Sequence, residues 1–284
     1  METKGVKIIM MQPEDLIESV ESLEAKIPSL IEQLRDNRLP LQAMIERNLK
    51  GKYKNSFIGT LWNILMPACL TFAVWLVFSE IKLYSFIDNY WFYLAIGMFT
   101  MTIVNNSIKG RTFYNNVNYV KKTSVPRWIV VLADAITQFI ILVISYVLLL
   151  ILALIVGIPL GLSVIVFLPI GLIFIFIMCL GCTLMFSTLN VVFNDIGHFM
   201  GVVSRIAVWL TPVFFTMDHA GPVLKTVASY NPFTYYLEMI HQTVCYASVP
   251  DLNILCTAGL LSVAFLSLGW ALFRHYEMQL AEMI

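Results

Sequence analysis

Residues 135–194 read AITQFIILVISYVLLLILALIVGIPLGLSVIVFLPIGLIFIFIMCLGCTLMFSTLNVVFN, which is 60 residues without an Asp, Glu, Lys or Arg. A helix needs about 20 mostly apolar residues to cross the hydrocarbon core of a bilayer, so this run is long enough for two crossings. The segment VGIPLG at 156–161 lies inside the run and supplies the Gly and Pro residues that interrupt helices. The stretch therefore predicts two membrane-spanning helices, at 129–155 and 163–186.

Charge-free runs of membrane size occur elsewhere in the chain, at 55–79, 89–108 and 252–273. A further apolar segment, 196–217, contains His198 and Arg205, so its membrane part is expected to be short or tilted. Soluble cores do not produce so many long gaps between charges. We therefore predict an all-α membrane protein with six transmembrane helices, at 57–79, 90–108, 129–155, 163–186, 200–217 and 252–273.

The composition of the whole chain agrees with this class. Of the 284 residues, 59% are hydrophobic and 13% are charged, whereas an average soluble domain carries about 25% charged residues. This balance excludes a disordered protein, most soluble enzymes and a nucleic-acid binder that relies on a basic surface. The 18 basic and 18 acidic residues cancel in net charge, so their positions carry the information.

The basic residues lie almost entirely on one side of the predicted membrane. Nine Lys and Arg residues precede the first span, five lie between spans two and three, and Arg205 and Arg274 flank spans five and six on the same side. Lys82 and Lys225 fall on the other side. Because cytoplasmic loops carry the excess of basic residues, both termini of this multi-pass protein are predicted to be cytoplasmic.

The chain ahead of the first span divides into two predicted segments. Residues 1–38 lack the apolar stretch of a cleavable signal peptide and include an acidic, amphipathic stretch. They predict a cytoplasmic helical extension, which either packs on a neighbour as a solvated helix or docks on the membrane surface or a partner. Residues 39–56 mix apolar and basic faces, as is typical of an amphipathic helix in the membrane interface. Simple anchoring and binding of a phospholipid-like ligand both fit that helix.

Two other segments resemble neither ordinary spans nor plain loops. Residues 221–250 are apolar and aromatic but are interrupted at Asn231–Pro232, and each half is too short to cross a bilayer. They predict an outer re-entrant hairpin between spans five and six, which is stable at membrane depth only where protein or water covers it. Residues 112–127 form either a short helix presented to a partner or a solvated connection, and residues 274–284 form a cytoplasmic tail.

The sequence lacks the patterns of the common catalytic and metal sites. Its one Gly-Lys pair, Gly51–Lys52, is preceded by Glu46 where a phosphate-binding loop needs glycine, so the chain is not predicted to hydrolyse ATP. Cys179 and Cys182 have metal-ligand spacing but lie inside a span, where they are expected to pack as small apolar groups. We predict a chain that is not an enzyme, with no catalytic residue, metal or cofactor of its own and no nucleic acid among its partners.

Two features of the predicted spans leave alternatives open. Asp134 is the one acid within a span, and it either faces the cytoplasmic mouth or serves as a hydrogen-bonded structural acid. Aromatic residues make up 13% of the chain. Most are expected at the two membrane interfaces, and a minority could line a channel, where sugar rings would stack on them.

Five motifs occur in order along the chain: KGKYKNSFIGTLW at 50–62, YVKKTSVPR at 119–127, FSTLNVVFND at 186–195, WLTPV at 209–213 and YNPFT at 230–234. Together they resemble the ABC-2 type permeases that export polysaccharides, and the resemblance covers residues 45–284. The chain departs from that family's pattern where Lys52 stands for Arg, Met66 for Asn and Asn194 for Arg.

The resemblance implies the membrane subunit of an ABC exporter in the bacterial inner or cytoplasmic membrane. Such a subunit moves a lipid-linked polysaccharide of the O-antigen, capsule or teichoic acid type. The resemblance also implies that two copies of the chain form a homodimer in contact with membrane lipids. This dimer is expected to bind two copies of a separate ATPase, which holds ATP and Mg²⁺. The alternatives are an ABC-2 permease for a drug or small lipid, and a membrane-embedded glycolipid-processing enzyme.

Three groups of site residues follow. The lipid pyrophosphate is expected to enter beside the cations at the end of the interfacial helix, an admission site made of Arg47, Lys50, Lys52, Tyr53 and Lys54. The segment 112–127 is expected to dock on the ATPase as a coupling helix through Asn118, Tyr119, Lys121, Lys122 and Arg127. The channel or outer gate is expected to include Trp62, Tyr230, Asn231, Pro232 and Tyr235.

Overall fold

The computed structural model of the chain describes residues 30–51, 61–81, 87, 89–193 and 195–280. The chain divides into two compact units, residues 1–39 and residues 40–284. In the first unit, helix α2 (Leu30–Asp36) has 7 residues, none of which is buried. The predicted extension at 1–38 is thus described only from Leu30 onward. Helix α3 (Arg38–Gly51) leads into the second unit.

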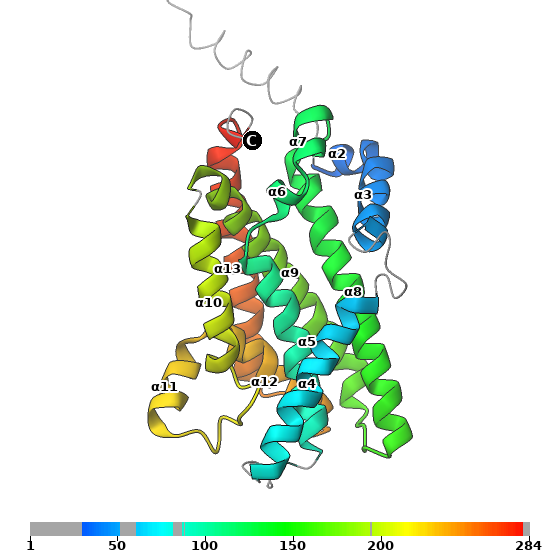
Figure 1. Cartoon of the computed structure of the whole chain (residues 1–284), viewed down its shortest axis with the longest axis vertical. Coiled ribbons are helices and arrows are strands. Elements are labelled where there is room, and N and C mark those ends of the chain that lie inside the picture. The colour runs from blue at the N-terminus through cyan, green and yellow to red at the C-terminus, as the bar shows by residue number, and fades with distance from the viewer. Residues whose placement is uncertain (1–29, 52–60, 82–86, 88, 194, 281–284) are drawn as a thin grey trace, which may run out of the picture. The chain divides into compact units, whose positions relative to one another are not determined.

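All regular elements in the described part of the chain are helices, which confirms the predicted all-α class at this level. The long helices of the second unit are α4 (Trp62–Ile81), α5 (Tyr90–Ile108), α8 (Arg127–Val156), α9 (Ser163–Val192), α10 (Ile196–Leu210) and α13 (Leu252–Tyr276). The short ones are α6 (Thr112–Asn115), α7 (Val117–Lys122), α11 (Pro222–Tyr230) and α12 (Pro232–Val244). Figure 1 shows the long helices running alongside one another, with α7 at one end of this bundle and α11 towards the other.

The run 135–194 forms the predicted pair of helices with a break between them. Helix α8 ends at Val156 because Gly157 follows in the left-handed conformation, with φ 83°, which favours glycine. Helix α9 begins at Ser163. Each helix has 30 residues, or about 45 Å at the rise of an α-helix. Both are therefore long enough to cross a hydrocarbon core with turns to spare.

Among the described residues, four helices are long and apolar enough to cross a membrane, namely α4, α8, α9 and α13. Helix α5, which carries Asn105 and Asn106 in its last turn, is not one of these four, although most of its residues are buried. Helix α10 is a shorter apolar helix of 15 residues. The count of six spans therefore stays a prediction.

The fifth predicted span, 200–217, differs from the structure in its boundaries. Helix α10 begins at Ile196 and ends at Leu210. Thr211 is extended, with ψ 149°, because a residue that precedes a proline avoids the helical conformation. The chain beyond Pro212 packs against α5, where the hydroxyl of Tyr93 donates to the carbonyl oxygen of Phe215 at 2.8 Å. At about 22 Å, α10 is shorter than a hydrocarbon core of about 30 Å.

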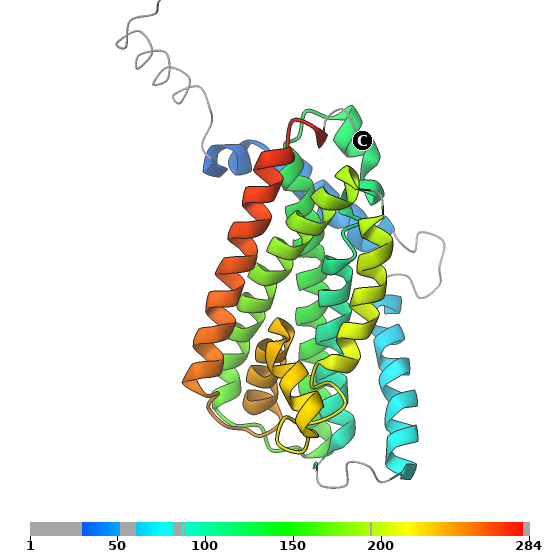
Figure 2. The ribbon, with the colours of Figure 1, turned by 90° about the vertical axis from the view of Figure 1, so that its left-hand side faces the viewer.

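Helices α9 and α13 lie side by side and approach each other closely at Gly181 and Gly269 (Figures 1 and 2). A Cβ atom on Gly269 would overlap the carbonyl oxygen of Gly181, and one on Gly181 would overlap the backbone of Phe265. Small residues permit this backbone approach between membrane helices. The α9–α13 pair therefore depends on two positions where a side chain has no space.

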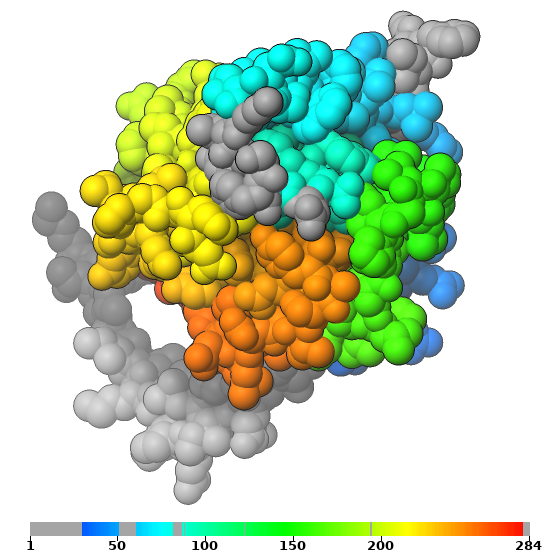
Figure 3. Space-filling view, turned by 90° about the horizontal axis from the view of Figure 1, so that it is seen from below, coloured from blue at the N-terminus to red at the C-terminus, as the bar shows by residue number. Residues whose placement is uncertain are grey.

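The segment predicted as a hairpin at 221–250 holds two helices, α11 and α12, which meet at Asn231–Pro232 as the sequence predicts. Pro232 begins α12, a position where its missing N–H costs no hydrogen bond. Leu237 and Ile240 of α12 are buried in the core shared with α5 and α9. Figure 3 views this end of the molecule, where the yellow-to-orange surface that contains this segment lies beside the cyan surface of α4 and the green surface of the α8–α9 connection. A position at membrane depth stays a prediction.

Candidate functional site

Helix α3, which carries Arg47 and Lys50 of the predicted admission site, and helices α6 and α7 of the predicted coupling segment lie towards one end of the bundle, which we call the basic end (Figure 1). Helix α3 packs there against α8. Met44 of α3 is fully buried and clusters with Val130 and Ala133. This apolar contact holds the amphipathic helix on the protein and fixes the side from which its basic residues project.

Arg47 of α3 joins the predicted admission site to the predicted coupling segment. Its guanidinium group lies 4.4 Å from the centre of the Tyr119 ring, within range of a cation–π interaction. The same group donates to the Oδ1 atoms of Asn48, at 2.9 Å, and Asn116. One side chain therefore ties α3 to α7 and to the α6–α7 connection.

The other admission residues are placed differently or lie outside the described part of the chain. Lys50 is exposed and pairs with Glu46 one turn earlier, at 3.2 Å. Lys52, Tyr53 and Lys54 fall in the range 52–60, which lies outside the described residues. The structure thus places Arg47 against protein and Lys50 towards the surroundings.

The segment 112–127 consists of two short helices, α6 and α7, rather than a plain connection. Asn118 and Lys121 are exposed and stand three residues apart on α7, so they share a face. Tyr119 is half-buried under Arg47. The side chain of Lys122 lies outside the described residues. The predicted coupling set therefore divides into exposed residues and residues that hold the segment in place.

Arg127 belongs to the second kind. It begins α8, and its guanidinium group donates to the backbone carbonyl oxygen of Glu277 at 3.1 Å. Glu277 directly follows α13, so this bond ties the end of the coupling segment to the C-terminal part of the chain. The bond gives Arg127 a structural role at the basic end, and its predicted contact with the ATPase stays a prediction.

A polar pocket of about 400 Å³ lies beside Arg47, and we call it the amide pocket. Its lining comes from α3, α4, the α6–α7 region and α8, and comprises Arg47, Asn48, Asn63, Asn115, Asn116, Asp134, Thr137, Gln138 and Ile141. Thr112 donates to the Oδ2 atom of Asp134 at 2.6 Å, and Asn106 donates to the Oε1 atom of Gln138 at 3.3 Å. Asp134 thus accepts a hydrogen bond, as one of its two alternatives expects, and it also lines the pocket; a position at the cytoplasmic mouth stays a prediction.

Asn190 forms a junction between three chain segments at the basic end. Its Nδ2 atom donates to the carbonyl oxygen of Gly110 at 2.9 Å, and its Oδ1 atom accepts from the backbone N–H of Gly197, also at 2.9 Å. Tyr114 of α6 donates to the backbone carbonyl oxygen of Asn190 at 3.2 Å. The end of α9 is thereby bonded to the α5–α6 turn, to α6 and to the start of α10.

The predicted gate residues do not form one cluster. Asn231 caps α12 by accepting from the N–H of Phe233 at 3.1 Å, and its amide donates to Thr211 Oγ1 at 2.8 Å, so it joins the end of α10 to α12. Tyr235 donates to the carbonyl oxygen of Ser229, and Tyr230 is 86% exposed. Trp62 instead begins α4. It lies about 24 Å along that helix from Phe78, whose ring meets the ring of Phe214 edge to face.

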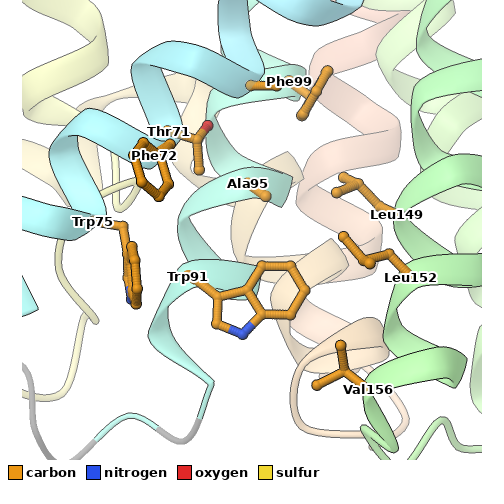
Figure 4. A pocket seen from close by; sticks show the side chains of 10 residues that line it. Thr71, Phe72, Trp75, Trp91, Ala95, Phe99, Leu149, Leu152 and Val156 are labelled. Carbon is orange, nitrogen blue, oxygen red and sulfur yellow. The ribbon is translucent and has the colours of Figure 1, made fainter.

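An apolar pocket of about 470 Å³ lies between α4, α5 and α8 (Figure 4). Phe72 and Trp75 of α4, Trp91 of α5 and Leu152 of α8 line it together with other side chains, of which Thr71 is the polar one. The neighbours of Trp75 and Trp91 in this pocket are mostly hydrocarbon. The two tryptophans therefore do not form a polar, sugar-binding surface here. The pocket suits an acyl chain or another hydrophobic group.

The sequence reasoning missed the residues that give the basic end its polar interior, chiefly Asn48, Asn63, Gln138 and Asn190. One signal was available. Asn63 and Gln138 fall in charge-free stretches, and polar side chains inside predicted spans are rare and tend to face the protein interior. Their convergence on one pocket depends on helix packing, which spacing along the chain does not reveal.

The four helices within the described ranges that are long and apolar enough to cross a membrane indicate a multi-pass membrane protein. Residues 40–244 match the protein family described as ABC-2 type transporter. The match covers more than half of the chain, and the chain therefore belongs to the ABC-2 type transporter family. Members of this family are the membrane subunits of transporters, so the alternative of a glycolipid-processing enzyme is set aside.

The chain is similar to proteins described as O-antigen export system permease protein RfbA. One from Klebsiella pneumoniae is 24% identical over 194 residues, which are 68% of this chain and 74% of that protein. The one from Myxococcus xanthus is 23% identical over 260 residues, which are 90% of this chain and 99% of that protein. The second alignment therefore covers nearly the whole length of that relative.

Proposed function

We propose that the chain is the permease subunit of an ABC exporter that moves a lipid-linked polysaccharide of the O-antigen type across the bacterial inner or cytoplasmic membrane. Relatives named for O-antigen export support the substrate class, since one aligns over 90% of this chain. The observation that carries the mechanism is the cation–π contact between Arg47 and Tyr119. This contact joins α3, which is expected to meet the lipid pyrophosphate, to α7, which is expected to meet the ATPase.

The proposed topology has six spans, α4, α5, α8, α9, α10 and α13, with both termini in the cytoplasm. The basic end then faces the cytoplasm, in line with the distribution of Lys and Arg. Helices α11 and α12 form the outer re-entrant hairpin. The burial of Leu237 and Ile240 supports this position, because backbone that does not span can lie at membrane depth only when protein covers it.

The separate ATPase is proposed to dock on the exposed face of α7. Asn118 and Lys121 are available there, and Lys122 follows in sequence. Movement of α7 would pass to α3 through Tyr119 and Arg47, and to α9 and α10 through α6 and Asn190. Two ATPase copies follow if each of two permease chains binds one.

A homodimer is proposed from the surface of α10. Arg205 is exposed on this apolar helix, with Val202, Ile206 and Trp209 exposed around it. A charged residue within a membrane span faces protein or a water-filled passage rather than lipid. A second copy packed against this face would enclose such a passage, with Arg205 on its wall.

The lipid pyrophosphate is proposed to enter beside Arg47 and Lys50, together with Lys52, Tyr53 and Lys54. Cations in this position neutralise phosphate oxygens through charge-assisted hydrogen bonds. The exposed side chain of Lys50 supports a contact with the lipid surface, where anionic head groups attract basic residues.

Reconstitution of the purified chain with its ATPase in lipid vesicles tests the function. We expect lipid-linked polysaccharide to stimulate ATP hydrolysis, and charge reversal by Lys50→Glu together with Lys52→Glu to abolish this stimulation while the protein still inserts. Unchanged stimulation in the double variant would overturn the admission site.

The apolar pocket of Figure 4 favours a second candidate, export of a drug or a small lipid, because its lining is hydrocarbon. The same vesicles separate the two functions. Stimulation by a hydrophobic drug or a free phospholipid, and none by the glycolipid, would replace the proposed substrate by this one.

A further inference from the structure

The amide pocket has an unusual composition for an interior at the end of a membrane bundle. Five of the residues that line it carry carboxamides: Asn48, Asn63, Asn115, Asn116 and Gln138. A carboxamide has two N–H donors and an acceptor oxygen. Asn116 uses both ends of its amide within the protein, on Thr112 and Arg47, and the Gln138 oxygen accepts from Asn106. The amide groups that are not engaged in this way can donate to a ligand or accept from it.

The charges of the pocket argue against an anion as its occupant. Arg47 supplies one positive charge to the lining, and the Asp134 carboxylate supplies one negative charge. The Arg47 guanidinium is already engaged with Tyr119 and Asn116. Sites for phosphate gather several cations or backbone N–H groups, whereas a neutral ligand with many hydroxyls fits one positive and one negative group among amides.

One donor in this region lacks a partner. The Nδ2 atom of Asn48 is buried and forms no hydrogen bond, although its Oδ1 atom accepts from Arg47. Leaving a buried donor unpaired costs a protein about 1–3 kcal/mol, so such groups call for a ligand or a bound water. Asn48 is one of the residues that line the pocket, so this unpaired donor lies within the pocket wall.

We propose that the amide pocket binds the sugar residue next to the lipid pyrophosphate, through hydrogen bonds between its carboxamides and the sugar hydroxyls. This inference rests on the proposed function and adds a recognition site to it. Arg47 belongs to both the admission site and the pocket wall, and a sugar bonded directly to the pyrophosphate would reach the pocket as the phosphates reach the cations. The volume of about 400 Å³ falls in the usual range of small-ligand pockets.

The proposal has a consequence for substrate choice. A site that pairs its buried polar groups with ligand hydroxyls rejects ligands that lack them, because those groups are then left unpaired. The chain would thus select lipids by their first sugar at the cytoplasmic side, before the rest of the glycan is moved.

Binding to the full-length chain and its ATPase in nanodiscs tests the proposal. The probes are a short-chain polyprenyl pyrophosphate that carries one N-acetylglucosamine or one galactose, and the same lipid without sugar. We expect the intact protein to bind one of the sugar-bearing lipids about tenfold more tightly than the bare lipid. Asn48→Leu and Gln138→Leu should each reduce this difference without altering the affinity for the bare lipid.

Gln42→Leu is the matched control, since Gln42 is an exposed amide on the same helix as Asn48 and lies outside the pocket. It should leave all affinities unchanged. Equal affinity of the intact protein for all three lipids, or equal weakening for all three in the pocket variants, would overturn the sugar site while the proposed export function stands. Failure of the intact protein to bind any of the three would instead overturn the proposed function.

Discussion

The side-chain amide of Asn190 donates a 2.9 Å hydrogen bond to the carbonyl oxygen of Gly110, 80 positions earlier in the chain. The same amide accepts from the N–H of Gly197 at 2.9 Å. A Cβ atom on Gly110 would overlap the carbonyl of Phe186, and its φ of 57° favours glycine. The α5–α6 turn is therefore held directly against the end of α9 and, through one side chain, against the start of α10.

Replacement of Asn190 should separate ATP hydrolysis from export. Asn190→Leu removes both bonds and leaves the buried groups of Gly110 and Gly197 unpaired, which costs about 1–3 kcal/mol for each group. We expect a lower melting temperature of the complex in detergent and an export rate that falls more than the ATPase rate. Asn253→Leu, at an exposed asparagine of α13, should change neither.

Asn190→Asp refines this test, because it keeps the acceptor for Gly197 and loses the donor to Gly110. Its export rate should lie between those of the intact protein and Asn190→Leu. Equal loss of ATPase and export activity in both variants would show that the junction only stabilises the fold.

The close approach of α9 and α13 predicts a large effect for a very small substitution. Gly269→Ala places a methyl group against the backbone of Gly181 and should destabilise the protein by about 1–3 kcal/mol, as overpacked cores do. Gly201→Ala is the control, because nothing lies within 4 Å of a Cβ at that helical position. Thermal unfolding in detergent should show a lower midpoint for the first variant and an equal or higher one for the second. Equal midpoints for the two variants would contradict the packing.

The contact between Arg47 and Tyr119 predicts a difference between two neighbouring cations. Arg47→Lys keeps the charge but loses the planar group that stacks on the ring and forks between two amides. We expect this variant to reduce glycolipid-stimulated ATP hydrolysis several-fold. Lys50→Arg retains an exposed pair with Glu46, which is worth about 0.3–0.5 kcal/mol, and should behave as the intact protein. Equal glycolipid-stimulated ATP hydrolysis in Arg47→Lys and Lys50→Arg would refute the role of the Arg47–Tyr119 contact.

The proposed topology predicts which exposed positions react from which side. In a variant whose native cysteines are replaced by serine, Tyr230→Cys on α11 should react with a membrane-impermeant maleimide in intact spheroplasts. Lys121→Cys on α7 should react only after the membrane is opened. Both side chains are exposed in the structure, so a difference reflects sidedness. The reverse pattern would invert the topology.

Many of the helices can be predicted from the charge-free runs and from the Gly and Pro residues that interrupt them. The charge-free run and the VGIPLG break predict α8 and α9, because Gly157 must take a left-handed conformation that ends one helix before the next begins. Asn231–Pro232 likewise predicts the boundary between α11 and α12, since Pro232 can start a helix but cannot continue one. Gly and Pro set the ends of helices through the conformation of the few residues around them, so these boundaries can be predicted from the sequence alone.

The candidate site was less accessible to prediction. Charge alone does not distinguish Arg47 from Lys50. In the structure Arg47 lies over the Tyr119 ring, whereas Lys50 is exposed and pairs with Glu46. The partners of Asn190 and the members of the amide pocket come from helices far apart in the chain. Such contacts depend on how helices pack against one another, and hydropathy gives no information on which polar faces meet. The end of α10 was missed for a local reason, because the apolar pattern continues past Thr211–Pro212 although the helix does not.

Transport in sealed vesicles tests the central claim most directly. The chain and its ATPase are reconstituted with lipid-linked polysaccharide, and glycan protected inside the vesicles from an added glycosidase is measured with and without ATP. Complexes whose ATPase faces outward should accumulate protected glycan when ATP is present, and Lys50→Glu together with Lys52→Glu should prevent it. Equal protection with and without ATP, in vesicles where the ATPase is active, would contradict export of a lipid-linked polysaccharide by this chain.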